Sequence, residues 1–291
     1  TNVPPQHVHA LILTPTRELA LQIHENFKIY GQNLKLKTAV VFGGVGITPQ
    51  IRAVENGVDV LIATPGRLVD LLESGSIKNM TPQFFILDEA DRMLDMGFVN
   101  DMRTILAELS TERQSFFFSA TMDPKVRALI NDFSKNPVTV SVKTGDTTDN
   151  VEQNIVKVGH TSEKIEKLHD ILMTEAAAKV LIFDDTQRSV ERLSKVLEER
   201  GFKADSIHGG KTQGQRQRAL SKFKTNQTNI LVATDVAARG IDVSGITHVI
   251  NYSTPQSYAD YVHRIGRTGR AGADGTAFSF CDYEEKVSLK D

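Results

Sequence analysis

The sequence has little of what membrane-spanning and secreted proteins require. Its 291 residues contain one cysteine, Cys281, so the chain can form neither an internal disulfide nor a cysteine metal cluster. No run of apolar residues exceeds four, whereas a membrane-spanning helix needs about 20, and no basic-then-apolar signal opens the chain. These absences argue against a membrane or secreted protein and favour a cytoplasmic one.

The chain also lacks a large net charge. It has 34 basic and 36 acidic side chains, which gives −2 and argues against binding of polyanions through bulk electrostatics. Positive charge is concentrated locally instead. Residues 206–224 contain no acid, and three arginines recur at every third position near the carboxyl end. The basic residues of these two segments are Lys211, Arg216, Arg218, Lys222, Lys224, Arg264, Arg267 and Arg270.

Short aliphatic runs alternate with helical patterns along the chain. Such runs are typical of strands in a parallel sheet, because both faces of that sheet are covered. A segment without aliphatic or aromatic residues, 143–150, divides the runs into two series. We therefore predict two α/β domains with mostly parallel sheets, 1–142 and 151–291, joined by the linker 143–150. The runs are 9–13, 38–42, 58–63, 84–87 and 115–118, then 180–183, 204–207, 230–232, 248–250 and 277–280.

Acidic residues follow the fourth run. Asp88 and Glu89 come directly after it and Asp91 two positions later, at the edge of the sheet where ligands of α/β proteins bind. Mg²⁺ with a nucleotide takes one or two carboxylates plus phosphate oxygens, and a neighbouring carboxylate can orient the attacking water. We assign Asp88 to the magnesium and Glu89 to the water. The alternative is that these acids only favour the start of the next helix.

The arginine repeat near the carboxyl end is interleaved with glycine. Arg264, Arg267 and Arg270 alternate with Gly266, Gly269 and Gly272, a composition that disfavours a helix. Glycine lets a ligand approach the backbone closely, and guanidinium groups match phosphate oxygens. The repeat predicts contacts to a transferred phosphoryl group. A solvated basic loop is the alternative.

Three segments in the first half have the chemistry of a phosphodiester-binding surface. Residues 14–18 and 63–67 each place a threonine and an arginine at the start of a helix, and a glycine pair follows the second run. Ordinary helix starts are the alternative, since proline suits a first turn. The candidate contacts are Pro15, Thr16, Arg17, Gly43, Gly44, Thr64, Pro65, Gly66 and Arg67.

The second half repeats this arrangement, but the chain has no phosphate-binding loop. Residues 233–242 follow a strand and supply Thr234 and Asp235, with Gly240 and Asp242 beyond them.

Residues 209–212, Gly-Gly-Lys-Thr, resemble the end of a phosphate-binding loop, yet position 205 is Asp where the full pattern needs Gly. The chain therefore lacks the usual cradle for ATP.

Taken in order, these segments resemble the DEAD-box ATP-dependent RNA helicases of superfamily 2. Their amino-acid sequences most resemble those of the bacterial RhlE-like group. The resemblance covers nearly the whole chain. It comprises 15–20 (motif Ia), 43–44 (the glycine doublet), 64–67 (Ib), 88–91 (the DEAD motif), 119–121 (III), 181–186 (IV), 213–216 (Gln-x-x-Arg), 233–242 (V) and 263–270 (VI).

The resemblance implies two RecA-like domains that use ATP and Mg²⁺ and bind RNA through its backbone, without sequence specificity. It implies that Asp88 and Glu89 serve magnesium and water, that Arg267 and Arg270 reach the γ-phosphate, and that Asp242, with Gly240, holds the ribose. RNA contacts would come from the segments of the first half named above and from Gln213, Arg216, Thr234 and Asp235. Coupling between the sites would fall to Asp91, Ser119, Thr121 and His263.

The family's amino-terminal Gln motif and phosphate-binding loop should precede Thr1. We therefore interpret the chain as a fragment and expect it to bind ATP poorly alone. Two other functions stay open: a non-catalytic RNA-binding clamp, and a DNA-directed superfamily 2 translocase. The first predicts RNA binding that ATP does not change, and the second predicts no preference for the 2′-hydroxyl of RNA.

Overall fold

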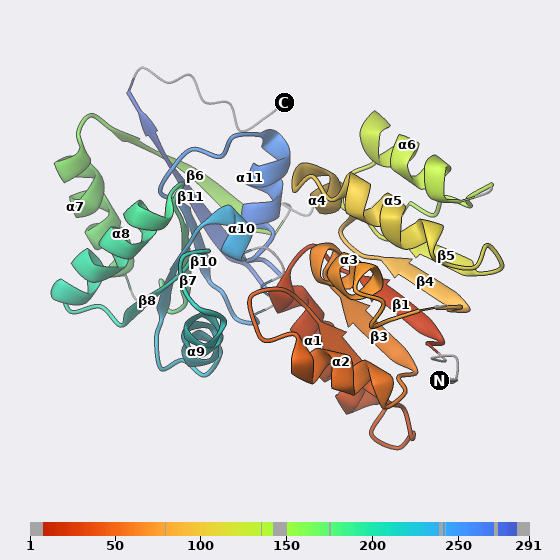
Figure 1. The fold of residues 1–291 in the computed structure, drawn as a ribbon. Coiled ribbons are helices and arrows are strands. Elements are labelled where there is room, and N and C mark those ends of the chain that lie inside the picture. Colours follow the sequence, from red (N-terminus) through yellow and green to blue (C-terminus); the bar gives the residue numbers. More distant parts are fainter. Residues whose placement is uncertain are drawn as a thin grey trace. The chain divides into compact units, whose positions relative to one another are not determined.

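The computed structural model divides the chain into two compact units, residues 1–140 (unit 1) and 141–291 (unit 2). It describes residues 8–78, 80–134, 136–141, 150–174, 176–238, 241, 243–270 and 273–283. Of the predicted linker 143–150, only Asn150 lies within the described residues. Figure 1 shows that each unit is a sheet flanked by helices. None of the described helices is both long and apolar enough to cross a membrane.

Unit 1 contains a five-stranded sheet in the order β2-β3-β1-β4-β5, and every pair of neighbours is parallel. Strands and helices alternate along most of the chain, as the aliphatic runs predict. The elements are β1 (Ala10–Leu13), α1 (Arg17–Tyr30), β2 (Thr38–Val41), α2 (Thr48–Glu55), β3 (Val60–Ala63), α3 (Pro65–Glu73), β4 (Phe84–Leu87), α4 (Ala90–Asp95), α5 (Val99–Ala107), β5 (Gln114–Phe117) and α6 (Pro124–Phe133).

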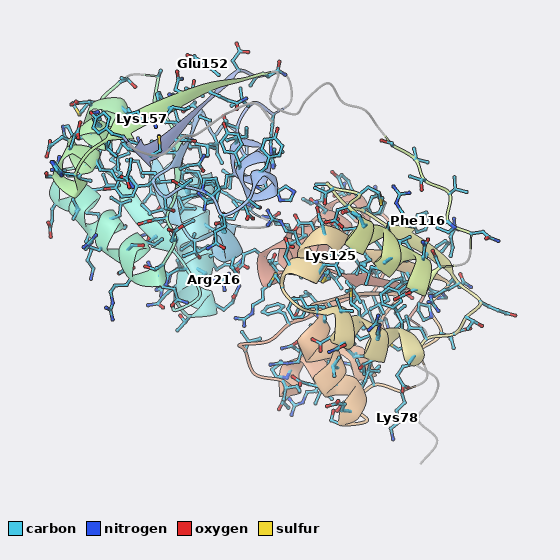
Figure 2. All side chains as sticks on the ribbon, turned by 90° about the horizontal axis from the view of Figure 1, so that it is seen from above. Lys78, Phe116, Lys125, Glu152, Lys157 and Arg216 are labelled. Atoms are coloured by element: carbon cyan, nitrogen blue, oxygen red, sulfur yellow. The ribbon has the colours of Figure 1, made fainter. Side chains whose placement is uncertain are left out.

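The two faces of the unit 1 sheet are covered unequally. Leu11, Leu61 and Phe85 lie side by side in the register and are fully buried in the larger apolar cluster. On the other face, α1 packs over β1 and β3. Beyond α1, the residues Phe84 and Phe116 are 42% and 37% exposed. Part of the β4 and β5 face therefore has no cover among the described residues. Figure 2 labels Phe116 on unit 1 and Arg216 on unit 2.

Unit 2 contains a six-stranded parallel sheet in the order β6-β11-β10-β7-β9-β8. Val190, Leu193 and Leu197, which recur at helical spacing, are all buried against it. The elements are β6 (Val151–Val158), α7 (Thr161–Leu172), β7 (Val180–Phe183), α8 (Gln187–Glu199), β8 (Ala204–Ile207), α9 (Gln213–Lys224), β9 (Ile230–Ala233), α10 (Asp235–Ala238), β10 (His248–Asn251), α11 (Tyr258–Ile265) and β11 (Gly275–Asp282).

The predicted fold class, α/β with parallel sheets in two parts, is confirmed. Every one of the ten aliphatic runs is a strand to within two residues at each end. β6 is the strand that the runs do not predict. It is an edge strand with the sequence Val-Glu-Gln-Asn-Ile-Val-Lys-Val, which contains no apolar run longer than two residues.

Candidate functional site

The loops that follow the first four strands of unit 1 lie at one edge of its sheet. Backbone hydrogen bonds join them: Thr14 donates to the carbonyl of Ala63 (2.9 Å), and Asp88 donates to that of Leu13 (3.0 Å). Thr64 donates to the carbonyl of Val41 (3.0 Å). The parallel register produces this arrangement, since all carboxyl ends point the same way. The segments of unit 1 predicted to contact ligands are therefore brought to one edge.

Asp88 is the first residue beyond β4 and is partly buried. Burial, the main cause, and the neighbouring carboxylate of Asp91 raise the pKa of Asp88, and a hydrogen bond from the Glu89 N–H to Asp88 Oδ1 (2.9 Å) opposes them. An acid whose charge is disfavoured in this way gains stability when a cation arrives. Within the described ranges, no three acidic, histidine or cysteine side chains form a metal-binding cluster. A single carboxylate beside phosphate oxygens suits Mg²⁺, which keeps most of its waters.

Glu89 has a strained backbone. Its φ of 50° and ψ of 55° are left-handed, a conformation that costs a residue other than glycine about 1 kcal/mol or more. Glu89 is also the residue before α4, whose Met93 N–H donates to the Glu89 carbonyl (3.0 Å). The sharp turn directs two successive carboxylates out of one strand end. Strain at such a position is typical of functional sites.

Asp91 is buried, and its carboxylate links the DEAD segment to residues 119–121. Thr121 donates to Asp91 Oδ2 from its N–H and from its hydroxyl, both at 3.1 Å. Ser119 in turn donates its hydroxyl to the carbonyl of Thr121 (2.7 Å), and Ala90 donates its N–H to the carbonyl of Phe118 (2.9 Å). The loops after β4 and β5 are therefore connected by three hydrogen bonds, and the bond from Ser119 to Thr121 braces the second loop internally. The three residues predicted to couple sites in this half, Asp91, Ser119 and Thr121, lie together.

The glycine doublet contacts an arginine of the first segment. Gly44 has a φ of +81°, and a Cβ added there would overlap the guanidinium of Arg17. Gly43 has more room, since the nearest atom to an added Cβ is Arg17 Nη2 at 3.8 Å. Arg67 donates from Nη2 to the carbonyl of Val45 (3.1 Å), beside the doublet. The two predicted arginines, Arg17 and Arg67, therefore meet at residues 43–45.

The remaining candidates of this half occupy helix starts. Thr16 caps α1, with its hydroxyl accepting from the Leu19 N–H (3.3 Å), and is buried, as is Pro15 before it. Thr64 precedes α3 but makes no side-chain capping bond, and Pro65 and Gly66 form the first turn. Thr64 thus has the position of a cap without the hydrogen bond of one.

In unit 2, Asp235 is held by an arginine. Arg264 donates from Nε to Asp235 Oδ1 (2.7 Å) and from Nη2 to Oδ2 (2.6 Å). Thr234, directly before Asp235, is 8% exposed, and its carbonyl accepts from the N–H groups of Ala237 and Ala238. The carboxylate of Asp235 therefore has a structural partner in addition to its predicted RNA contact. Arg264 belongs to the predicted arginine repeat, but its spacing there gave no sign of burial.

Arg267 and Arg270 lie in the tight loop that follows α11. Arg267 donates from Nη1 to the carbonyl of Ile241 (3.0 Å) and from Nε to that of His263 (3.3 Å). Arg270 donates from Nε to the carbonyl of Gly266 (2.7 Å). The backbone geometry of the loop depends on Gly269, whose φ is +68° and whose added Cβ would overlap Val151 at the start of β6. His263, Arg267 and Arg270 are thus placed on one short segment.

The Gln-x-x-Arg element opens α9. Gln213 lies in the first turn, and neither its side-chain oxygen nor its nitrogen, both buried, has a hydrogen-bond partner in the described part of the chain. Arg216, one turn later, is 8% exposed. The nearby Lys211 ion-pairs with Glu191 and Asp205, both at 3.5 Å, so its charge is compensated within unit 2. Gly240 and Asp242, predicted at the ribose, lie outside the described residues.

Comparisons with known proteins agree with these motifs. A DEAD/DEAH box helicase family profile matches residues 2–130, and a helicase conserved C-terminal domain profile matches residues 163–272. The ATP-dependent RNA helicase DBP2 of Chaetomium globosum is 44% identical over 287 residues, which cover 97% of this chain and 51% of that protein. The chain spans about half the length of the curated relatives it matches.

Two solved structures are similar in fold. A DEAD box protein from Methanococcus jannaschii is 39% identical, with 95% of this chain and 74% of that chain covered and a TM-score of 0.52. Dbp5 of S. cerevisiae bound to RNA and ADP BeF3 is 28% identical, with 98% and 74% covered and a TM-score of 0.82. Both units are therefore RecA-like α/β domains. The chain belongs to the DEAD-box helicase family.

Proposed function

We propose that this chain is the two-domain core of an ATP-dependent RNA helicase, in which ATP hydrolysis is coupled to RNA binding and to local unwinding of a duplex. The observation that carries the proposal is the strand end at Asp88 and Glu89. A carboxylate with a raised pKa precedes a strained residue with a second carboxylate, beside the Asp91 and Thr121 link. The names of similar proteins, ATP-dependent RNA helicase for DBP2 and a complex with RNA and ADP BeF3 for Dbp5, support the same function.

In this proposal Asp88 holds Mg²⁺ through water and Glu89 orients the water that attacks the triphosphate. Mg-ATP, when bound, supplies the phosphoryl group whose transfer releases the free energy used on RNA. Arg267 and Arg270 act on the negative charge that develops on the γ-phosphate, and Asp242 with Gly240 holds the ribose. Two nitrogens of Arg267 and one of Arg270 already donate to backbone carbonyls, which limits the directions in which the remaining N–H groups can point.

We propose that RNA binds the residues gathered at the carboxyl edge of each sheet. Arg17, Gly44 and Arg67 meet at residues 43–45, where guanidinium groups and open backbone suit a phosphodiester. In unit 2 the buried amide of Gln213, without a partner in the described part of the chain, suits a polar ligand. Such contacts reach phosphate and sugar, so the proposed binding does not depend on base sequence. The other proposed contacts are Pro15, Thr16, Gly43, Thr64, Pro65, Gly66, Arg216, Thr234 and Asp235.

Coupling between the two ligands is assigned to Asp91, Ser119, Thr121 and His263. The hydrogen bonds from Thr121 to Asp91 give this assignment a physical basis in unit 1, because a shift of the loop after β5 must move the DEAD segment. We take residues 1–142 and 151–291 as the two functional domains and 143–150 as their linker. Placement of the protein among RhlE-like helicases, and in the cytoplasm, also belongs to this proposal.

These 291 residues alone are proposed to bind ATP weakly. The chain contains no Gly-x-x-x-x-Gly-Lys-Ser/Thr pattern, whose backbone N–H groups and lysine hold the β- and γ-phosphates in P-loop enzymes. A turnover comparable with that of an intact helicase, measured on these residues, would contradict this part.

RNA binding of the 291-residue chain tests the proposal most simply. A fluorescent single-stranded RNA should bind, and unlabelled RNA should compete better than DNA of the same sequence. Equal competition would favour the DNA-directed translocase. Addition of ATP to the natural protein that contains this chain should raise RNA affinity; an unchanged affinity would favour the non-catalytic clamp. No RNA binding by either form would refute the proposed function.

A further inference from the structure

Arg264 is almost fully buried, yet every nitrogen of its guanidinium is hydrogen-bonded. The side chain is 1% exposed. Besides the two bonds to Asp235, Nη1 donates to the carbonyl of Ser253 (2.8 Å) and to Oδ1 of Asn251 (3.3 Å). The guanidinium also lies 5.2 Å from the ring centre of Phe183. Four residues therefore hold the guanidinium, and its bidentate pair with Asp235 fixes its orientation.

The partners of Arg264 come from different elements of unit 2. Asp235 opens α10, Asn251 ends β10, and Phe183 ends β7. Asn251 is itself fixed, since its Nδ2 donates to Ser279 Oγ of β11 at 2.9 Å. Arg264 therefore ties α11 to the carboxyl ends of β7 and β10 and to the start of α10.

The pair of Arg264 and Asp235 joins two segments for which we propose different ligands, RNA and the γ-phosphate. Thr234, a proposed RNA contact, directly precedes Asp235 in the sequence. The N–H of Arg267, a proposed γ-phosphate contact, donates to the carbonyl of Arg264 itself (3.1 Å). A second hydrogen bond also joins the two segments, because Arg267 Nη1 donates to the carbonyl of Ile241, which follows α10. A shift of α10 relative to α11 must therefore disturb Arg267.

A buried ion pair is a costly way to add stability, because apolar side chains of the same shape often stabilise a core as well or better. What the pair provides, and apolar packing does not, is a fixed angle between two elements. We propose that Arg264 and Asp235 are positioning residues which transmit the state of the RNA segment at Thr234 to Arg267 and Arg270. This inference rests on the proposed function and assigns a route within unit 2 between its two ligands.

The test is a nitrogen-15 NMR measurement of arginine side chains in the 291-residue chain. The Nε–Hε resonances of Arg267 and Arg270, assigned from lysine variants at each position, are recorded with and without single-stranded oligouridylate at saturating concentration. In the unaltered chain, RNA should shift both resonances. In Arg264→Lys, which keeps the charge and loses the fork, and in Asp235→Asn, the shift should be lost even when RNA is saturating.

The matched control is a second bidentate pair in the same unit. Arg200 donates to both oxygens of Glu166 at 3.1 and 2.6 Å, but this pair lies on the surface. Glu166→Gln should leave the RNA-induced shifts of Arg267 and Arg270 intact. Thermal unfolding is measured in parallel, since a purely structural pair would lower the melting temperature in Arg264→Lys without removing the shifts.

The outcomes separate the inference from the function on which it rests. Shifts that persist unchanged in a folded Arg264→Lys chain overturn the inference and leave the helicase proposal intact. Loss of the shifts in Arg264→Lys but not in Glu166→Gln supports it. If Asp235→Asn does not fold, Arg264→Lys decides alone. If the unaltered chain does not bind oligouridylate at all, the inference fails, and the proposed function fails with it only if the natural protein does not bind RNA either.

Discussion

Thr121 donates two hydrogen bonds to one oxygen of Asp91, 30 positions earlier in the sequence, and both measure 3.1 Å. The other oxygen of Asp91 accepts from the N–H of Arg92 (3.0 Å). A buried carboxylate needs such partners, because an unpaired charge away from water is expensive. The last acid of the DEAD segment is thus satisfied by the loop after the neighbouring strand, and the two loops are held as one piece.

Removal of the Thr121 hydroxyl should weaken this connection. Thr121→Val keeps the N–H donor and the shape of the side chain, so we expect it to lower the free energy of unfolding by about 1 kcal/mol. Denaturation in urea measures the change. Thr139→Val, at an exposed position outside any described element, is the control and should change stability by less than about 0.5 kcal/mol. A Thr121→Val chain as stable as the control would show that the bond contributes nothing.

The two glycines of the doublet should respond differently to alanine. Gly44→Ala introduces a Cβ into the Arg17 guanidinium at a φ of +81°, so we expect a loss of about 1 to 2 kcal/mol in stability and weaker RNA binding. Gly43→Ala has room for the methyl group and should cost less than about 1 kcal/mol. Urea denaturation and RNA titration measure both. Equal effects at the two positions would contradict the contact with Arg17.

Glu191 should make unit 2 sensitive to acid. A hydrogen bond from Ser206, then contacts from His208 and Lys211, lower the pKa of Glu191 from 4.5 to about 2. Because the folded pKa is depressed, this stabilisation is present above pH 4.5 and is lost as the pH falls towards 2. Glu191→Gln should therefore be less stable at pH 7, by about 1 kcal/mol or less since the side chain is 38% exposed, and should lose less between pH 4.5 and 2.

Thermal unfolding across that pH range measures the difference. Glu198→Gln, on the same helix and exposed, is the control. If both variants have the same acid dependence as the unaltered chain, the interaction of Glu191 with Ser206 is not a source of stability.

The effect of Asp88 on the pH dependence of stability should have the opposite sign to that of Glu191. Burial raises its pKa, so the folded unit holds the charged form less well than the unfolded chain does. Its charge costs stability at neutral pH, and that cost disappears as the pH falls through the raised value. Asp88→Asn should therefore stabilise unit 1 at pH 7, by about 1 kcal/mol or less, while abolishing ATP turnover in the natural protein. A lower melting temperature in Asp88→Asn would contradict this reading.

Sequence patterns predicted strands wherever a parallel sheet is covered on both faces, since such strands are continuous aliphatic runs. β4, β7 and β8 match their predicted bounds completely. The edge strand β6 escaped prediction because three polar residues follow Val151 and its apolar residues form no run longer than two. Val151, Ile155 and Val158 are four and three positions apart, so the strand also lacks the period of two that would have indicated it.

The site residues were predicted from residue type and position after a strand, and the structure adds their partners. Nothing in the spacing of Arg264, Arg267 and Arg270 distinguishes the buried arginine from the others, because burial depends on Asp235 and Asn251, distant in the sequence. The contact of Arg17 with Gly44 is likewise a product of the sheet order, which brings loops of separate strands together. Pairings of this kind are tertiary and have no local signal.

The central claim is that Glu89 serves hydrolysis of ATP in a helicase that RNA activates. ATP turnover of the natural protein that contains these residues, measured with and without single-stranded RNA, tests it most directly. We expect RNA to raise the turnover, and Glu89→Gln to reduce it by about 100-fold or more through loss of the group that orients the water. A Glu89→Gln protein that hydrolyses ATP as fast as the unaltered one would contradict the account.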